Sequence, residues 1–241
     1  MLSVRGIHKA YGGLQVLTNV NIEAPTDRIT GLIGPNGAGK TTLFNVITGF
    51  VKPDSGSFSF NGRDLTGVAP EKVCVYGIAR TFQLVKTFNN LTVEKNVAIG
   101  ALSREKTIAQ AHSKAREILN FLGMNHKRAA LARNLTLSDR KRLEVARALA
   151  TNPKMLLLDE VMCGLNPTEI NGMMEVIRAI HRTGVGILLI EHIMSAVMSL
   201  SDHIIVLNNG QKLTEGNAEK VSHDPAVIVA YLGEEYARAY N

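Results

Sequence analysis

The sequence contains no tryptophan, and aromatic residues make up only 5% of its 241 positions, so aliphatic side chains must fill most of the core. It has two cysteines, Cys74 and Cys163, which are too few for a disulfide framework and lack the spacing of a metal site. No apolar run approaches the roughly 18 residues of a membrane-spanning helix. The first six residues lack the charged and then apolar layout of a secretory signal. We therefore expect a soluble, cytosolic protein with reduced thiols.

The remaining composition is ordinary for a globular protein. Hydrophobic residues make up 45% and charged residues 20%, which excludes disordered and fibrous classes. The length predicts one large domain, or a domain with an appended subdomain. The net charge of +6 is unevenly placed, because eleven Lys and Arg but only four Asp and Glu lie between Arg104 and Arg147. Such a block could face nucleic acid, anionic lipid or phosphates, or it could consist of solvated helix faces.

The order of expected elements predicts an α/β fold. Buried strands are expected at 29–33, 155–158, 186–190 and 204–207, and helices near 40–48, 168–181 and 192–200. Strands that alternate with helices indicate a mainly parallel sheet with helices on both faces. Further strand patterns occur at 2–7, 16–22 and 57–60, and Asn61-Gly62 and Asn209-Gly210 are typical hairpin turns. Apolar residues at helical spacing from about 92 to 150 predict a helical block inserted into the α/β domain.

A glycine-rich loop follows the first of these buried strands. Residues 34–41 fit the pattern G-x-x-x-x-G-K-[ST] at every fixed position, between an expected strand and an expected helix. Glycines let consecutive backbone N–H groups converge on phosphate oxygens, and the helix N-terminus adds positive potential. Lys40 would bridge the β- and γ-phosphates, and the Thr41 hydroxyl would ligate Mg²⁺. The candidate nucleotide-binding residues here are Gly34, Pro35, Asn36, Gly37, Ala38, Gly39, Lys40, Thr41 and Thr42.

Two carboxylates directly follow the aliphatic strand at 155–158. Ligands of open parallel sheets bind beyond the carboxyl ends of the strands, where Asp159 and Glu160 are expected to lie. Asp159 would hold Mg²⁺ through water, and Glu160 would act on the attacking water as a general base or polariser. An acidic pair at this place could also be no more than the start of a loop. Together with the phosphate loop, however, it indicates a catalytic site.

His192 and Gln83 complete the candidate site. His192 follows the strand at 186–190, again at a carboxyl end, where a neutral imidazole can bond both the γ-phosphate and a backbone carbonyl. Gln83 carries a neutral amide that could reach Mg²⁺ or the water. We therefore assign Glu160, His192 and Gln83 as candidate catalytic residues. Thr41, Gln83 and Asp159 are the candidate magnesium ligands.

The phosphate loop, Gln83, the helical insertion, the Asp159-Glu160 pair and His192, in this order, resemble ATP-binding cassette (ABC) ATPases over essentially the whole chain. The resemblance implies a P-loop NTPase fold with a mainly parallel sheet, an N-terminal antiparallel β subdomain and an inserted helical subdomain. Within a single domain, 1–87 and 151–241 would form the core and 88–150 the helical insertion. It also implies that Tyr11 stacks on adenine, although a lone tyrosine could equally pack in a strand.

The resemblance further implies a head-to-tail dimer in which each ATP lies between one phosphate loop and the partner's signature segment. In this chain the family's L-S-G-G-Q aligns with residues 135–139, which we call the signature segment. Its candidate nucleotide contacts are Thr136 and Ser138. Leu137 and Ser138 replace two glycines, and Ser138 suits the start of the following helix. Asp139 would bring a negative charge towards the γ-phosphate, so closure of the dimer would be weakened or tuned.

Within this family the chain is most similar to the ATPase subunits of branched-chain amino-acid importers. The matching stretches are 34–50, 80–83, 139–144, 164–167 and 231–234. The resemblance implies an ATP- and Mg²⁺-dependent subunit at the cytoplasmic face of the inner membrane, bound to transmembrane permease subunits. A periplasmic or extracellular solute-binding protein would be an indirect partner, and no nucleic acid is expected. The permease would dock near Gln83 to Phe88 and the helical insertion.

Two alternatives use the same site. One is a regulatory or weakly hydrolysing ABC subunit that binds ATP but barely turns it over. The other is a soluble ABC ATPase that acts on nucleic acid through the basic block. Proteins of the second kind usually carry a second cassette or a long coiled-coil insertion, and neither is present in this sequence.

Overall fold

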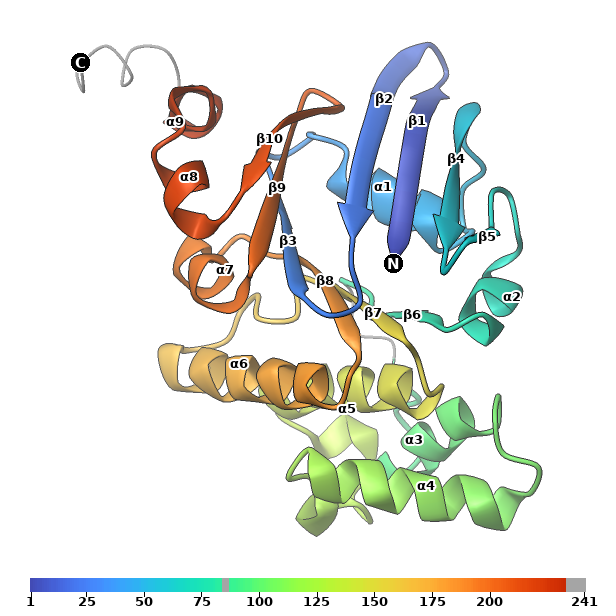
Figure 1. Cartoon of the computed structure of the whole chain (residues 1–241). Helices are drawn as coiled ribbons and strands as arrows, with labels where there is room; N and C mark the ends of the chain where they lie inside the picture. The colour runs from blue at the N-terminus through green and yellow to red at the C-terminus, as the bar shows by residue number, and fades with distance from the viewer. Residues whose placement is uncertain (84–86, 233–241) are drawn as a thin grey trace.

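The computed structural model describes residues 1–83 and 87–232, and in these residues the strands form a six-stranded and a four-stranded sheet (Figure 1). The larger sheet has the order β10-β9-β3-β8-β7-β6, and only the β9–β10 pair is antiparallel. Its strands are β3 (Ile29–Ile33), β6 (Ile78–Arg80), β7 (Met155–Asp159), β8 (Gly186–Ile190), β9 (His203–Asn208) and β10 (Gln211–Gly216). β3, β7 and β8 are buried along their whole length, as strands covered on both faces must be. The predicted mainly parallel sheet is confirmed.

The smaller sheet is antiparallel and is formed by the N-terminal part of the chain. Its order is β2-β1-β4-β5, with β1 at Leu2–Tyr11, β2 at Leu14–Ala24, β4 at Ser55–Phe60 and β5 at Arg63–Asp64. Asn61 and Gly62 both have positive φ, 49° and 78°, which is the conformation that a tight hairpin turn requires. The N-terminal antiparallel region expected from the sequence is therefore present.

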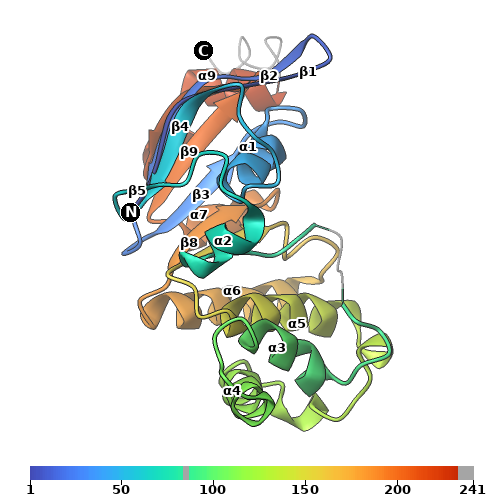
Figure 2. The ribbon, with the colours of Figure 1, turned by 90° about the vertical axis from the view of Figure 1, so that its right-hand side faces the viewer.

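Helices cover both faces of the larger sheet (Figures 1 and 2). α1 (Lys40–Ile47) lies between the two sheets and buries Leu43 and Phe44. On the opposite face α5 (Leu137–Ala150) and α6 (Pro167–Arg182) pack against Leu156 and Leu158, because alternate strand residues point to opposite faces. The other helices are α2 (Pro70–Val75), α3 (Val93–Ala101), α4 (Ile108–Phe121), α7 (Met194–Leu200), α8 (Ala218–Ser222) and α9 (Pro225–Leu232).

α3, α4 and α5 pack against one another and form the lower part of the molecule in Figure 1. α4 begins with a capping box at Thr107 and Gln110, and Gly123, with a φ of 70°, follows its last turn. Two short 3₁₀ helices, Asn125–Lys127 and Ala132–Asn134, lead from α4 to α5. This unit places the N-terminal end of α5, with the signature segment, at the surface.

The predicted helix at 192–200 starts two residues later than expected. α7 begins at Met194, and Ile193, with extended backbone angles, is its N-cap residue. His192 therefore lies in the loop between β8 and α7. This position, beyond the carboxyl end of a buried strand, is the one that a ligand-binding side chain needs.

Candidate functional site

The phosphate loop, residues 34–41, connects β3 to α1. Gly34, Gly37 and Gly39 have φ values of 152°, 81° and 97°. A Cβ atom at Gly34 would lie 2.1 Å from the carbonyl oxygen of Leu207, so no other residue fits there. At Gly37 nothing lies within 4 Å of such an atom, because this glycine faces open space. The loop is thus held tightly where it meets the sheet and is accessible at its tip.

The side chain of Lys40 lies inside the loop and binds to its backbone. Its Nζ donates hydrogen bonds to the carbonyl oxygens of Gly34, at 2.6 Å, and Pro35, at 3.0 Å, and the residue is buried. Burial lowers the pKa of this ammonium group, while the negative charges of Glu160 and Asp159 raise it. The lysine is therefore held in place by two neutral carbonyl groups that an anion could replace.

A cavity of about 260 Å³ opens above the loop and gathers side chains from three strand ends. Most of the predicted loop residues line it, together with all three candidate catalytic residues. The lining residues are Val16, Asn36, Gly37, Ala38, Gly39, Lys40, Thr41, Thr42, Gln83, Glu160 and His192. Gly34 and Pro35 lie at the base of the loop, where their carbonyl groups accept from Lys40.

Glu160 lies at the centre of the catalytic candidates. Its Oε2 accepts a hydrogen bond from Gln83 Nε2 at 2.8 Å, and its Oε1 lies 2.5 Å from His192 Nε2. Its backbone has a φ of 51°, a conformation that is uncommon for a residue with a side chain, and Lys141 Nζ donates to its carbonyl oxygen at 2.9 Å. The carboxylate is thus oriented on both sides at the edge of the cavity.

Asp159, the last residue of β7, forms a buried ion pair with Arg80. Arg80 Nη2 lies 2.7 Å from Asp159 Oδ2, and the backbone N–H of Asp159 donates to Thr81 Oγ1 at 3.1 Å. Asp159 Oδ1 is buried and has no hydrogen-bond partner among the residues that the structure describes. Such an oxygen fits a magnesium ion or one of its waters, which supply the missing partner. Thr41, the second candidate ligand, presents an exposed side chain to the cavity.

Within the described ranges, 1–83 and 87–232, no group of three His, Cys, Asp or Glu side chains could hold a metal ion. Magnesium in a nucleotide site is usually held by one or two protein ligands together with phosphate oxygens and water. The candidate ligands Asp159, Thr41 and the exposed Gln83 carry oxygen atoms, which are the donors that this ion prefers.

Three residues that support the site were not identified from the sequence as site residues: Arg80, Lys141 and Glu191. Glu191 is buried, and its carboxylate accepts from the backbone N–H groups of Met162, at 2.7 Å, and His192, at 3.3 Å. Burial raises the pKa of Glu191, which the two backbone hydrogen bonds counteract. Glu191 directly follows β8, and Asp159 is the last residue of β7. An acidic residue at the carboxyl end of a buried strand is the sequence signal that could have identified Glu191.

Thr136 and Ser138 are not among the described residues that line the cavity. Thr136 is the N-cap of α5, and its Oγ1 accepts from the N–H of Asp139 at 3.2 Å. Ser138, which was expected to suit the start of this helix, is its second residue, and the N-cap position is occupied by Thr136. Asp139 does not carry a free negative charge: Lys127 Nζ lies 2.5 Å from its Oδ2.

Tyr11 and Tyr231 lie outside the cavity lining. Tyr11 ends β1 with a half-exposed ring, and the ammonium group of Lys9 lies 5.5 Å from the ring centroid. Tyr231 lies in α9, and its hydroxyl group forms a hydrogen bond with the backbone of Gly34, at the base of the phosphate loop. Burial raises the pKa of this hydroxyl, and the bond to Gly34 lowers it. Tyr231 also belongs to the stretch 231–234 that carries the family resemblance; residues 233 and 234 lie outside the described residues.

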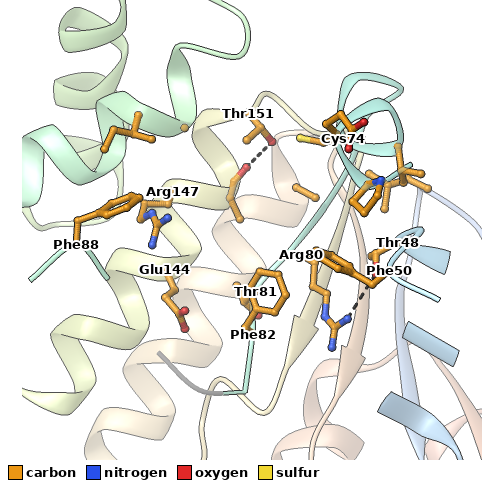
Figure 3. Close-up of a pocket in the computed structure, with 18 residues that line it drawn as sticks. Thr48, Phe50, Cys74, Arg80, Thr81, Phe82, Phe88, Glu144, Arg147 and Thr151 are labelled. Carbon is orange, nitrogen blue, oxygen red and sulfur yellow. Dashed lines mark hydrogen bonds between the residues drawn. The ribbon is translucent and has the colours of Figure 1, made fainter. Parts of the chain in front are cut away.

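A second and larger cavity, of about 580 Å³, lies between the helical unit and the larger sheet (Figure 3). Phe50 and Phe82 are on one wall, with ring centroids 5.6 Å apart in an edge-to-face arrangement. Phe88 and Arg147 are on the other, with the guanidinium group 4.8 Å from the ring centroid.

No helix in the described part of the chain is long and apolar enough to cross a membrane.

Comparisons with known proteins agree with this geometry. The family model "ABC transporter" matches residues 17–162, and the model "Branched-chain amino acid ATP-binding cassette transporter" matches residues 211–237. The high-affinity branched-chain amino acid transport ATP-binding protein LivG of Escherichia coli (strain K12) is 39% identical over 252 residues, which cover 97% of this chain and 98% of that protein. BraF of Pseudomonas aeruginosa, with the same description, is 35% identical over 250 residues, covering 97% and 98%.

Solved structures show the same fold. A crystal structure of a nucleotide-free ATP-binding cassette from an ABC transporter has a TM-score of 0.89 and 34% identity, and the match covers 97% of this chain and 99% of that chain. The ADP conformation of an ATP-binding cassette of an ABC transporter has a TM-score of 0.88 with 34% identity, again over 97% and 99%.

Proposed function

Because this chain belongs to the ABC transporter family of ATP-binding cassettes, we propose that it hydrolyses ATP as the motor subunit of an importer of branched-chain or related amino acids. The single observation that carries the proposal is the position of Glu160. Its carboxylate, oriented by Gln83 and His192, lies at the edge of a cavity whose floor is a phosphate loop. The names of LivG and BraF support the solute class.

The triphosphate would bind to the backbone N–H groups of the loop and to the N-terminus of α1. Lys40 Nζ would exchange the carbonyl oxygens of Gly34 and Pro35 for phosphate oxygens, a charge-assisted replacement for two neutral hydrogen bonds. Magnesium, held by Asp159 and Thr41 with Gln83, would neutralise charge on the β- and γ-phosphates. The half-exposed ring of Tyr11 would stack on adenine.

Glu160 would orient the attacking water in line with the γ-phosphate and accept its proton. His192 and Gln83 hold this carboxylate in the structure, so both would define the direction of attack. When a γ-phosphate is present, His192 would also bond to it and thereby connect the loop after β8 to the state of the nucleotide. Positioning and charge neutralisation would then supply most of the catalysis.

The signature segment supports a head-to-tail dimer. Thr136 and Ser138 do not line the cavity of their own chain in the part that the structure describes, and Leu137 between them is 47% exposed. We propose that these residues contact the ATP bound to a second ATPase subunit, either an identical chain or a related one. Two subunits would close around two nucleotides and separate after hydrolysis.

The 580 Å³ cavity supports contact with the permease. Its walls carry Phe50, Phe82 and Phe88, and aromatic side chains of this kind suit a docked cytoplasmic segment of a transmembrane subunit. Phe88, at one end of the expected docking region from Gln83 to Phe88, lines this cavity, and residues 84–86 of that region lie outside the described residues. The subunit would thus be peripheral at the cytoplasmic face of the cell membrane, and a periplasmic or extracellular solute-binding protein would act only through the permease.

Three basic residues of the block form ion pairs in the structure. Lys114 pairs with Glu117 at 2.8 Å, and Lys127 pairs with Asp139. Arg116 lies 3.6 Å from Glu94. These pairs support the interpretation of solvated helix faces for this part of the block.

Phosphate release tests the proposal. The wild-type chain and Glu160→Gln are compared with ATP and Mg²⁺, alone and with the permease of the neighbouring genes. We expect release from the wild type and a loss of about 100-fold or more in the variant. Equal release from both, with the permease present, would identify a nucleotide-binding regulatory subunit instead. A variant of the exposed Glu117, Glu117→Gln, is the matched control and should behave as the wild type.

A further inference from the structure

The N-terminal end of α5 carries a three-residue cluster that the proposed catalytic residues do not include. A single oxygen, Asp139 Oδ2, binds Lys127 Nζ at 2.5 Å and accepts from Thr136 Oγ1 at 2.8 Å. Lys127 comes from the 3₁₀ helix Asn125–Lys127, and Thr136 is the N-cap of α5. The lysine side chain is 34% exposed, whereas that of Asp139 is only 15% exposed. The cation therefore forms the outer part of the cluster.

The cluster is electrically balanced. Burial raises the pKa of Asp139, but the hydrogen bonds from Lys127 and Thr136 outweigh it and hold the pKa below its ordinary value. The carboxylate is therefore ionised and paired at neutral pH. An unpaired Asp139 would repel an approaching phosphate, and the paired one does not.

The charge balance between Lys127 and Asp139 affects phosphate binding because of the two residues between Thr136 and Asp139. Leu137 and Ser138 carry side chains where a glycine-rich segment would expose bare backbone, so fewer backbone N–H groups can approach a phosphate closely. An ammonium group is a compact cation with three rotatable donors, and it can replace such N–H groups as a phosphate ligand. Lys127 lies next to the hydroxyl group of Thr136, the residue of the signature segment that caps α5.

We propose that Lys127 is a phosphate-binding residue for the ATP of the partner subunit, and that Asp139 presents it together with the Thr136 hydroxyl group. This inference rests on the head-to-tail dimer of the proposed function. When the dimer closes, Lys127 Nζ and Thr136 Oγ1 turn from Asp139 Oδ2 to the γ-phosphate. Asp139 is a positioning residue, because one of its oxygen atoms binds both donors until the phosphate binds.

Dimer formation in the Glu160→Gln background tests the role of Lys127. Sedimentation gives the dimer dissociation constant at saturating ATP, and a fluorescent ATP analogue gives nucleotide affinity of the monomer. We expect Lys127→Ala to weaken dimerisation by about tenfold or more, and Lys127→Arg to restore most of it. Nucleotide affinity of the monomer should not change, because Lys127 is not among the described residues that line its own cavity.

Lys114→Ala is the matched control. Lys114 also lies in the helical unit, its side chain is 32% exposed, and it also forms an ion pair, with Glu117 at 2.8 Å. It should dimerise as the Glu160→Gln parent does. Thermal unfolding of each variant shows whether the helical unit remains folded.

The double variant Lys127→Ala/Asp139→Asn separates phosphate binding from simple neutralisation of Asp139. We expect it to remain weak, because the ammonium group is still missing. Full recovery of dimerisation would overturn the phosphate-binding role, as would a Lys127→Ala variant that dimerises like the parent. If the parent binds the ATP analogue but stays monomeric, the proposed dimer fails and the role of Lys127 fails with it; if the parent does not bind ATP at all, the proposed function itself fails.

Discussion

Arg80 and Asp159 form an ion pair that is buried from solvent, with 6% of the arginine side chain and 1% of the aspartate side chain exposed and 2.7 Å between Nη2 and Oδ2. Arg80 Nη1 also donates to Asn45 Oδ1 on α1 at 2.6 Å. The arginine therefore joins β6, the end of β7 and the helix that follows the phosphate loop. One carboxylate oxygen is fixed in this way, and the other is left for the proposed magnesium ion.

Replacing Arg80 should destabilise the protein. Arg80→Ala leaves Asp159 buried without its counter-ion, and we expect the free energy of unfolding to fall by about 3 kcal/mol. Urea denaturation measures this difference. Arg5→Ala removes a solvent-exposed pair with Glu23 and should change the free energy of unfolding by about 0.5 kcal/mol or less. Similar losses in both variants would show that the Arg80–Asp159 pair does not stabilise the fold.

The buried Glu191 predicts a pH dependence of stability. Its pKa is raised in the folded protein by burial, above the ordinary value of 4.5. The unfolded chain therefore loses this proton at lower pH than the folded chain, and ionisation of Glu191 costs stability as the pH rises above about 4.5. In Glu191→Gln this cost is absent, so the variant should gain stability relative to the wild type between pH 4 and neutral pH. A difference that does not change with pH would contradict the raised pKa.

The contact between Tyr231 and Gly34 predicts a link between α9 and nucleotide binding. Tyr231→Phe removes the hydroxyl group that bonds to the base of the phosphate loop, and we expect ATP affinity to fall by about threefold. Equilibrium titration with a fluorescent ATP analogue measures this effect. Tyr76→Phe is the control, because the ring of Tyr76 lies over Arg63, 4.4 Å from its guanidinium carbon, and is part of neither cavity wall. Equal affinity in Tyr231→Phe and the wild type would exclude the link.

The buried strands β3, β7, β8 and β9, the phosphate loop and the placement of Glu160 and His192 at strand ends could be predicted from the sequence, whereas β6, the strand before Gln83, was not expected. These features depend on local patterns: aliphatic runs give buried strands, and the loop pattern fixes the backbone between β3 and α1. Parallel strands bring their carboxyl ends to one edge, so Glu160 and His192 had to lie near each other although 32 residues separate them.

The side-chain pairs that support the site could not be predicted in this way. Whether Arg80 reaches Asp159 depends on the relative position of two neighbouring strands that are 79 residues apart in the sequence. The pair of Lys127 and Asp139 depends on how the 3₁₀ helices turn the chain back towards α5. Sequence reasoning gave Asp139 an unpaired charge because the lysine, twelve residues earlier, has no fixed spacing from it.

Binding of ATP to wild type and to Lys40→Ala tests the central claim most directly, namely that a triphosphate binds to the loop at residues 34–41. Isothermal titration measures the affinity for ATP. The control is Lys212→Ala, because Lys212 pairs with Glu215, whereas Lys40 is buried in the phosphate loop. We expect Lys40→Ala to lose about 100-fold or more in affinity, because the cation between the β- and γ-phosphates is removed, and Lys212→Ala to bind as the wild type does. Unchanged affinity in Lys40→Ala would contradict the account.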